Sequence, residues 1–129
     1  MRVLVAEDDV VSRRILETLL RNWGHDVVTT LDGEQAWRAM CEPGSPALAI
    51  LDMSMPHLQG LDVIRYMRTE KRLMRIPIML ITAEQNVKLL ADGFSAGAAA
   101  FLPKPFTPDQ LRSVLRMLLG TKTRDSRAA

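Results

Sequence analysis

The strongest constraint on the fold is a set of five short apolar runs that alternate with segments of helical periodicity. These runs lack the two-residue alternation of apolar and polar side chains that is typical of a sheet with one solvent-exposed face. Near-continuous apolar runs of this length are typical of parallel strands covered by helices on both sides. The expected strands are Arg2–Glu7, Asp26–Thr30, Ala47–Asp52, Ile76–Ile81 and Ala98–Leu102.

Between the runs, apolar residues recur at the three- and four-residue spacing of amphipathic helices. The first stripe runs from Val11 to Trp23 and stops at Gly24, a residue type that often follows a helix end. Asp32 is expected to cap a short second helix over Asp32–Met40. The remaining stripes are Leu61–Met67, Val87–Phe94 and Leu111–Leu118, the last opened by Thr107 or Asp109 and ended by Gly120.

Five strand–helix units in 129 residues predict one doubly wound α/β domain, with a parallel five-stranded sheet and helices on both faces. Right-handed crossovers favour the strand order 2-1-3-4-5, with its topological switch beside strands 1 and 3. The domain is expected to span residues 1–120. Residues 121–129 are small, polar and basic, and we expect a frayed tail or the start of a linker there.

Composition and charge exclude several classes of protein. The net charge is only +2, and the arginines are spread over predicted helices without interleaved aromatic residues, so we expect no direct nucleic-acid binding. The apolar runs are too short for a membrane span or signal peptide. The single cysteine, Cys41, cannot form an internal disulfide, so we expect a cytoplasmic protein. A dinucleotide-binding domain is excluded because no Gly-x-Gly-x-x-Gly follows the first strand.

Polar residues of particular kinds follow four of the strands at their carboxyl ends. Because open α/β sheets bind ligands at this edge, these side chains should share a pocket. The residues are Glu7 and Asp8, Asp52, Thr82, and Lys104. Three acids, a hydroxyl and an ammonium can hold a divalent cation, accept a phosphoryl group and neutralise its charge.

Each of these residues also has a purely structural explanation. Glu7 and Asp8 could share a hard cation such as Mg²⁺, or form an acidic cluster at a helix N-terminus, where Asp9 is the expected cap. Asp52 could be a turn residue, and Thr82 could cap the helix that follows it. Only their joint occurrence, in order and on successive strands, favours a shared site.

Two further details concern the loops around this expected pocket. The main-chain carbonyl of Ser54, two residues after Asp52, could complete a metal shell. The Lys104–Pro105 bond is a candidate for the cis isomer, because cis bonds occur mainly before proline in tight turns.

Taken together, the motifs resemble the receiver domain of bacterial two-component response regulators, which has the CheY-like fold. The resemblance covers Arg2 to about Gly120, and its markers are Val5–Asp9, Ile50–Gly60, Ile81–Ala83 and Phe101–Phe106. It implies a phosphoprotein of a phosphorelay, in which a histidine kinase or histidine phosphotransfer protein phosphorylates an aspartate. It also implies a Mg²⁺ cofactor, with Mn²⁺ as an alternative ion.

The resemblance assigns a role to each residue of the expected pocket. It implies that Asp52 is the phosphoacceptor, and that Thr82 and Lys104 hold the phosphoryl oxygens. The metal ligands it implies are Glu7, Asp8, Asp52 and the main-chain carbonyl of Ser54.

A conformational switch is also implied by the resemblance. Thr82 would move toward the phosphoryl group while the aromatic residue of the fifth strand, Phe101, rotates inward. The surface of helix 4, strand 5 and helix 5 would then control a downstream partner, a fused output domain or a phosphorylation-dependent homodimer. Phe101 lacks the hydroxyl of the tyrosine often found there, and it could instead be a permanent core residue. Gln59 replaces the acid common before the loop glycine, which affects the loop rather than the chemistry.

Two other functions compete with this interpretation. A haloacid-dehalogenase-like phosphohydrolase also uses an aspartyl phosphate, but its nucleophile belongs to an early Asp-x-Asp motif, where this chain has Glu7-Asp8-Asp9. A receiver fold that is never phosphorylated would act only as a scaffold, and the complete set of acids, threonine and lysine argues against it. We expect no catalytic activity beyond self-catalysed phosphoryl transfer and slow autodephosphorylation.

The lifetime of the phosphorylated state should depend on Ser54 and Glu84. These residues lie two positions beyond Asp52 and Thr82, where they would flank the path of an attacking water. We therefore expect that Glu84→Ala changes the rate of dephosphorylation more than the rate of phosphorylation. Both rates can be followed by intact-protein mass spectrometry with a small acyl-phosphate donor, and equal changes in both would contradict the prediction.

Overall fold

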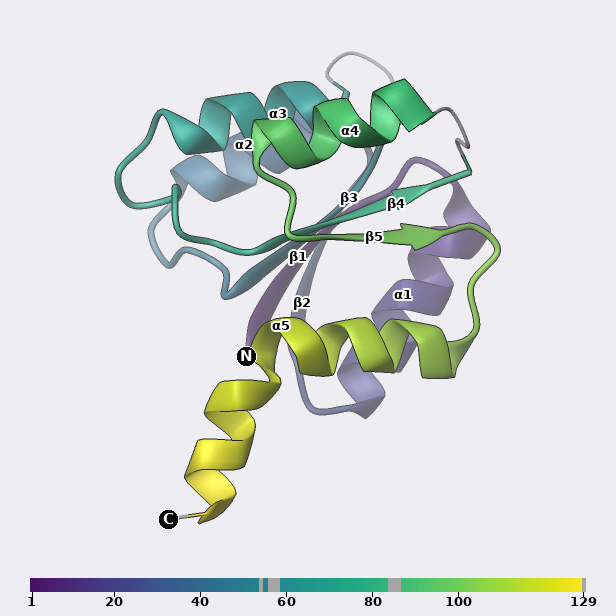
Figure 1. Ribbon diagram of the computed structural model, residues 1–129, viewed down its shortest axis with the longest axis vertical. Helices are drawn as coiled ribbons and strands as arrows, with labels where there is room; N and C mark the ends of the chain where they lie inside the picture. Colours follow the sequence, from purple (N-terminus) through teal and green to yellow (C-terminus); the bar gives the residue numbers. More distant parts are fainter. Residues whose placement is uncertain (54, 56–58, 84–86, 129) are drawn as a thin grey trace.

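The computed structural model describes residues 1–53, 55, 59–83 and 87–128, with the side chains of residues 87 and 120–128 excepted. Strands and helices alternate along this part of the chain (Figure 1). The strands are β1 (Arg2–Ala6), β2 (Asp26–Thr30), β3 (Leu48–Asp52), β4 (Ile78–Thr82) and β5 (Ala100–Pro103). The helices are α1 (Val10–Asn22), α2 (Gly33–Cys41), α3 (Gly60–Arg68), α4 (Val87–Ala96) and α5 (Pro108–Ala128).

All five strands pair in parallel in the order β2-β1-β3-β4-β5, which confirms the predicted topology. Three strands begin one or two residues later than their apolar runs suggest. In β4 the reason is Pro77, which has no amide hydrogen to donate to a neighbouring strand, so the paired segment begins at Ile78.

Helices cover both faces of the sheet, with α2, α3 and α4 on one side and α1 and α5 on the other (Figure 1). Successive residues of each strand point to opposite faces, so the strands feed two separate cores. In β3, Ala49 and Leu51 contribute to the core beneath α2–α4, while Leu48 and Ile50 contribute to the core beneath α1 and α5. Burial on both faces explains why the runs are apolar without alternation.

Side chains at the helix N-termini bond the free amides of the first turns. Asp9 accepts a hydrogen bond from the Ser12 amide at 2.8 Å, and Asp32 accepts one from Gln35 at the same distance, so both predicted caps are confirmed. At α5 the cap is Thr107, whose hydroxyl accepts a hydrogen bond from the Gln110 amide at 3.1 Å. Thr107, rather than Asp109, therefore opens the last helix.

The prediction that Gly120 ends the last helix is wrong. Helix α5 continues through Gly120 to Ala128, and its last turns extend away from the sheet (Figure 1). One glycine inside a helix costs only about 1 kcal/mol relative to alanine. The lysine and arginine residues that follow are good helix formers, so this cost does not stop the helix. The domain boundary at residue 120 stays a prediction.

Arg68, at the end of α3, connects three segments near the amino-terminal edge of the sheet. Its guanidinium group donates hydrogen bonds to the carbonyls of Met74 (2.8 Å), Ile76 (3.2 Å) and Gly97 (2.7 Å). Gly97 has φ of 122°, and a Cβ there would lie 2.5 Å from Arg68 Nε. Arg68 thus fixes both the connection from α3 to β4 and the end of α4.

We expect Arg68→Met to lower the free energy of unfolding by about 2 kcal/mol, because three carbonyls lose a charged donor. Chemical denaturation measures this change. Arg75→Met is the matched control, since Arg75 is exposed in the same connection; its effect should stay within about 0.5 kcal/mol. Equal losses in the two variants would show that the three hydrogen bonds do not stabilise the fold.

Candidate functional site

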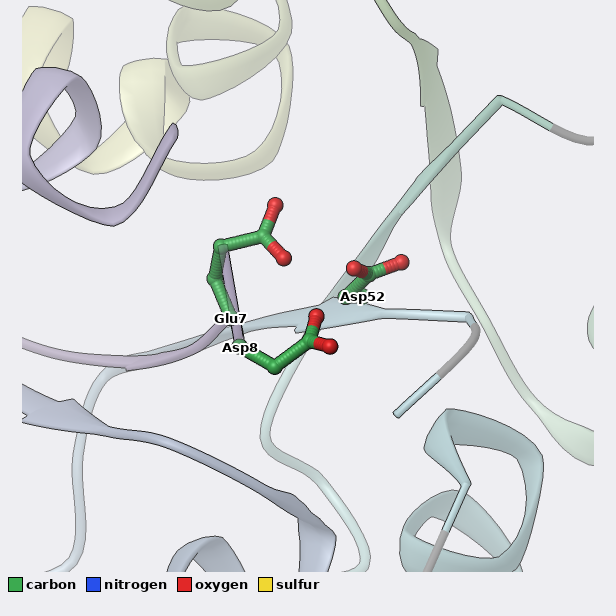
Figure 2. A group of neighbouring side chains, drawn as sticks. All are labelled: Glu7, Asp8 and Asp52. Carbon is green, nitrogen blue, oxygen red and sulfur yellow. The ribbon is translucent and has the colours of Figure 1, made fainter. Parts of the chain in front are cut away.

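Three carboxyl groups converge at the carboxyl edge of the sheet. Glu7 and Asp8 follow β1 directly, and Asp52 is the last residue of β3, which pairs with β1. Figure 2 shows the three carboxyl groups around a shared space, and one oxygen from each lies within 4.8 Å of the others. Glu7 is fully buried, Asp52 is 5% exposed, and Asp8 is open to solvent.

This donor set fits a hard divalent cation. Mg²⁺ prefers carboxylate oxygens and retains several waters, so a few acids beside an open face are sufficient. The structure therefore brings together the predicted side-chain ligands Glu7, Asp8 and Asp52. Asp9 caps α1 instead, as expected.

Lys104 lies between the two buried acids. Its Nζ is 2.5 Å from Glu7 Oε1 and 3.0 Å from Asp52 Oδ2, where it donates a hydrogen bond. Lys104 follows β5, and its backbone amide donates to the Thr82 carbonyl at 2.8 Å, which ties it to the end of β4. The Lys104–Pro105 bond is cis, as the sequence suggested.

The buried charges shift one another's ionisation. Burial raises the pKa of Glu7 to about 8; Asp52 adds to the rise, and Lys104 opposes it. Burial alone would lower the pKa of Lys104, but the hydrogen bonds and charges of Glu7 and Asp52 outweigh it and raise that pKa. The ammonium therefore stays charged at neutral pH. The pair of carboxyl groups, by contrast, resists carrying two negative charges without a further cation.

A cavity of about 330 Å³ opens beside Asp52. Thr82 and Lys104 line it, so the acid, the hydroxyl residue and the ammonium predicted from separate strands share one space. The other lining residues are Met53, Gln59, Leu61, Ala83 and Leu89. The small side chain of Ala83 and the open face of the cavity leave room for a phosphoryl-sized group.

Two residues that support the site were not identified from the sequence. A Cβ at Gly60 would lie 2.5 Å from the Asp52 carbonyl oxygen, so only glycine lets α3 begin against this strand end. Arg13 of α1 donates to the carbonyls of Glu7 (3.0 Å) and Asp8 (3.4 Å) and holds the acidic segment in place. The sequence carries a signal for Gly60, which is the glycine of the loop motif after Asp52. It carries no comparable signal for Arg13.

Three further predicted residues cannot be assigned to this cavity. Ser54 and Glu84 lie outside the described residues. Phe101 is partly buried against the core beneath α4, where its ring contacts Phe94. Its proposed role in a switch stays a prediction.

The fold and this cavity define the class of α/β phosphoacceptor signalling domains. The family model of the response regulator receiver domain matches residues 3–116, and the chain belongs to this family of two-component signalling proteins.

Known proteins similar to this chain include some of about the same length and some that are about twice as long. The chemotaxis protein CheY1 of Helicobacter pylori is 34% identical over 122 residues, which cover 94% of this chain and 98% of CheY1. The probable transcriptional regulator ycf27 of Cyanophora paradoxa is 39% identical over 118 residues, 92% of this chain but 48% of that protein.

A solved structure with the same fold holds a metal ion. The receiver domain of a sensor histidine kinase from Pseudomonas aeruginosa PAO1 has a TM-score of 0.84 and 29% identity, covering 92% of this chain and 97% of that one. That protein has a magnesium ion coordinated in its active-site cleft.

Among the described residues of the present chain, no helix is long and apolar enough to cross a membrane.

The raised pKa of Glu7 predicts a pH-dependent affinity for Mg²⁺. Below about pH 8 the ion must displace a proton from Glu7, so binding should tighten as the pH rises from about 6 to about 8. Isothermal titration calorimetry measures the affinity at each pH. In Glu7→Gln, which has no proton to lose at this position, the dependence should be much flatter. The same slope in both proteins would contradict the prediction.

Proposed function

We propose that Asp52 is the phosphoacceptor of this receiver domain and that a histidine kinase or histidine phosphotransfer protein is the donor. The observation that carries this proposal is the position of Asp52, a carboxylate 5% exposed, hydrogen-bonded to Lys104 and open to the cavity that Thr82 also lines. Among the carboxyl groups of the acidic cluster, Asp52 alone lines this cavity.

The reaction we propose is an in-line transfer. A carboxylate oxygen of Asp52 forms a bond to phosphorus while the bond from phosphorus to the donor's imidazole nitrogen breaks and leaves its electron pair on that nitrogen. The product is an acyl phosphate. Water later attacks the phosphorus, which releases inorganic phosphate and restores the carboxylate.

The surrounding side chains stabilise the charge that moves. Lys104 pairs with the Asp52 carboxylate before transfer and would pair with a phosphoryl oxygen afterwards. Such a pairing is stronger in a buried site than in water, because the local dielectric constant is low. The Thr82 hydroxyl would donate a hydrogen bond to another phosphoryl oxygen. Glu7, Asp8 and Asp52 would hold Mg²⁺, or Mn²⁺ in its place, and the bound ion would neutralise further phosphoryl charge.

Several further assignments belong to the same proposal. The Ser54 carbonyl would complete the metal shell, and Ser54 and Glu84 would tune the rate of hydrolysis. The domain would occupy residues 1–120 and work in the cytoplasm. It would have no catalytic activity beyond its own phosphorylation and dephosphorylation.

The output of the domain would be a protein partner, an attached domain or a homodimer. Phosphorylation would change the surface formed by α4, β5 and α5, with Thr82 and Phe101 as switch residues. The relatives support more than one of these outputs, since CheY1 is a chemotaxis protein that matches over 98% of its length and ycf27 is a probable transcriptional regulator that matches over 48% of its length.

Incubation with Mg²⁺ and a small acyl-phosphate donor tests the proposal. We expect the mass to rise by one phosphoryl group, the modification to be lost at alkaline pH, and Asp52→Asn to remain unmodified. Asp9→Asn is the matched control, because Asp9 caps α1 outside the acidic cluster and its variant should still be labelled. Equal labelling of Asp52→Asn and the wild type would refute the assignment. Steady hydrolysis of phosphomonoesters would instead favour a phosphohydrolase.

A further inference from the structure

Gly93 is buried in α4, where glycine is an unfavourable choice for a helix. Glycine inside a helix costs about 1 kcal/mol relative to alanine, so its presence calls for a local reason. The reason is steric: a Cβ at this position would lie 2.6 Å from Phe101 Cζ and 2.9 Å from Leu80 Cδ1. The tip of the Phe101 ring therefore occupies the space that a side chain at position 93 would fill.

Phe101 and Leu80 lie opposite each other in β5 and β4 and differ in their freedom to move. Leu80 is fully buried in the core beneath α2–α4, so it has little room to give way. Phe101 is only partly buried and lies on the edge strand β5, so its ring has more room to move than Leu80 has. A side chain at position 93 would thus displace the Phe101 ring.

The next residue of α4 contacts the same ring. The Phe94 and Phe101 rings meet edge to face, with centroids 4.5 Å apart and planes at 73°. This is a favoured geometry for an aromatic pair. Phe94 is itself 53% exposed, so the pair connects the inner ring to the protein surface.

Helix α4 also reaches the cavity beside Asp52. Leu89 lines that cavity, and Gly93 lies four residues later, one turn along the same face of the helix. On β4, Thr82 lines the cavity and Leu80, two residues earlier, points to the same face of the sheet. Two adjacent elements therefore connect the cavity with the Phe101 ring.

We propose that Gly93 and Phe94 are positioning residues, which hold the Phe101 ring between α4 and the sheet and so couple the state of Asp52 to the position of α4. Gly93 provides the space for the inward ring, and Phe94 provides its aromatic contact. The coupling to Asp52 rests on the proposed function, whereas the control of the ring does not. Because coupling between two states is reciprocal in free energy, a change that excludes the ring from the space at Gly93 should also change the free energy of phosphorylation, and we expect the rate to follow it.

The test uses ¹⁹F NMR of protein labelled with 4-fluorophenylalanine. The chain has three phenylalanines, and a Phe106→Leu spectrum together with a Phe101→Leu spectrum assigns the three resonances. In unphosphorylated Gly93→Ala we expect the Phe101 resonance to move toward the value of a solvent-exposed ring, with a population shift of about tenfold. Ser95→Ala is the matched control, since Ser95 is exposed on the same helix and the substitution also raises helix propensity.

Phe94→Leu provides a second variant that adds no atom to the interior. It should move the Phe101 resonance in the same direction, because the ring loses its edge-to-face partner. Circular dichroism and Mg²⁺ affinity should match the wild type in all these variants, which shows that the fold and the acidic cluster are intact. A Phe101 resonance that responds no more to Gly93→Ala and Phe94→Leu than to Ser95→Ala would overturn the proposal.

A double-mutant comparison tests the coupling to Asp52. With a small acyl-phosphate donor, Gly93→Ala should change the phosphorylation rate several-fold, but it should have little effect in a Phe101→Ala background, where no ring remains to be displaced. An equal effect in both backgrounds would mean that Gly93 acts only through the helix, and would overturn the coupling. If the wild type takes no phosphoryl group at all, the proposed function fails, while the ring measurement still decides the positioning role.

Discussion

The site depends on the ammonium of Lys104, which lies between the buried carboxyl groups of Glu7 and Asp52. Two carboxylates out of contact with water repel each other and lose solvation, and one positive charge compensates for only part of that cost. The part of the cost that is not compensated raises the pKa of Glu7. A cluster of this kind has an excess of negative charge, which a divalent cation would neutralise.

The fold explains why such a cluster is tolerated. The strands are buried on both faces by two layers of helices, so the apolar cores stabilise the sheet without help from its edge (Figure 1). The charged residues are confined to the carboxyl ends of β1, β3 and β5, where the chain leaves the core. Contacts with the backbone then hold them in place. Arg13 donates hydrogen bonds to the carbonyls of Glu7 and Asp8, and Gly60 lets α3 begin in contact with Asp52.

Local patterns were sufficient to predict most of the fold. Strand and helix order follow from apolar periodicity, the caps Asp9 and Asp32 follow from residue type, and the strand order follows from the handedness of crossovers. The end of α5 was mispredicted because a lone glycine signals a helix end only when the residues after it do not favour a helix. The candidate site was predictable because parallel strands place their carboxyl ends together. Asp52, Thr82 and Lys104 line one cavity, and Glu7 and Asp8 lie beside Asp52 in the acidic cluster.

The sequence by itself determined the elements, their order and the residue types at the edge of the sheet, since these depend on interactions over a few residues. Only the tertiary structure decided which atoms meet across the chain. The Lys104 ion pairs, the donors from Arg68 and the space at Gly93 for the Phe101 ring each join residues from different elements. Such contacts depend on how helices pack on the sheet to within an ångström, and no local pattern encodes a distance of that kind.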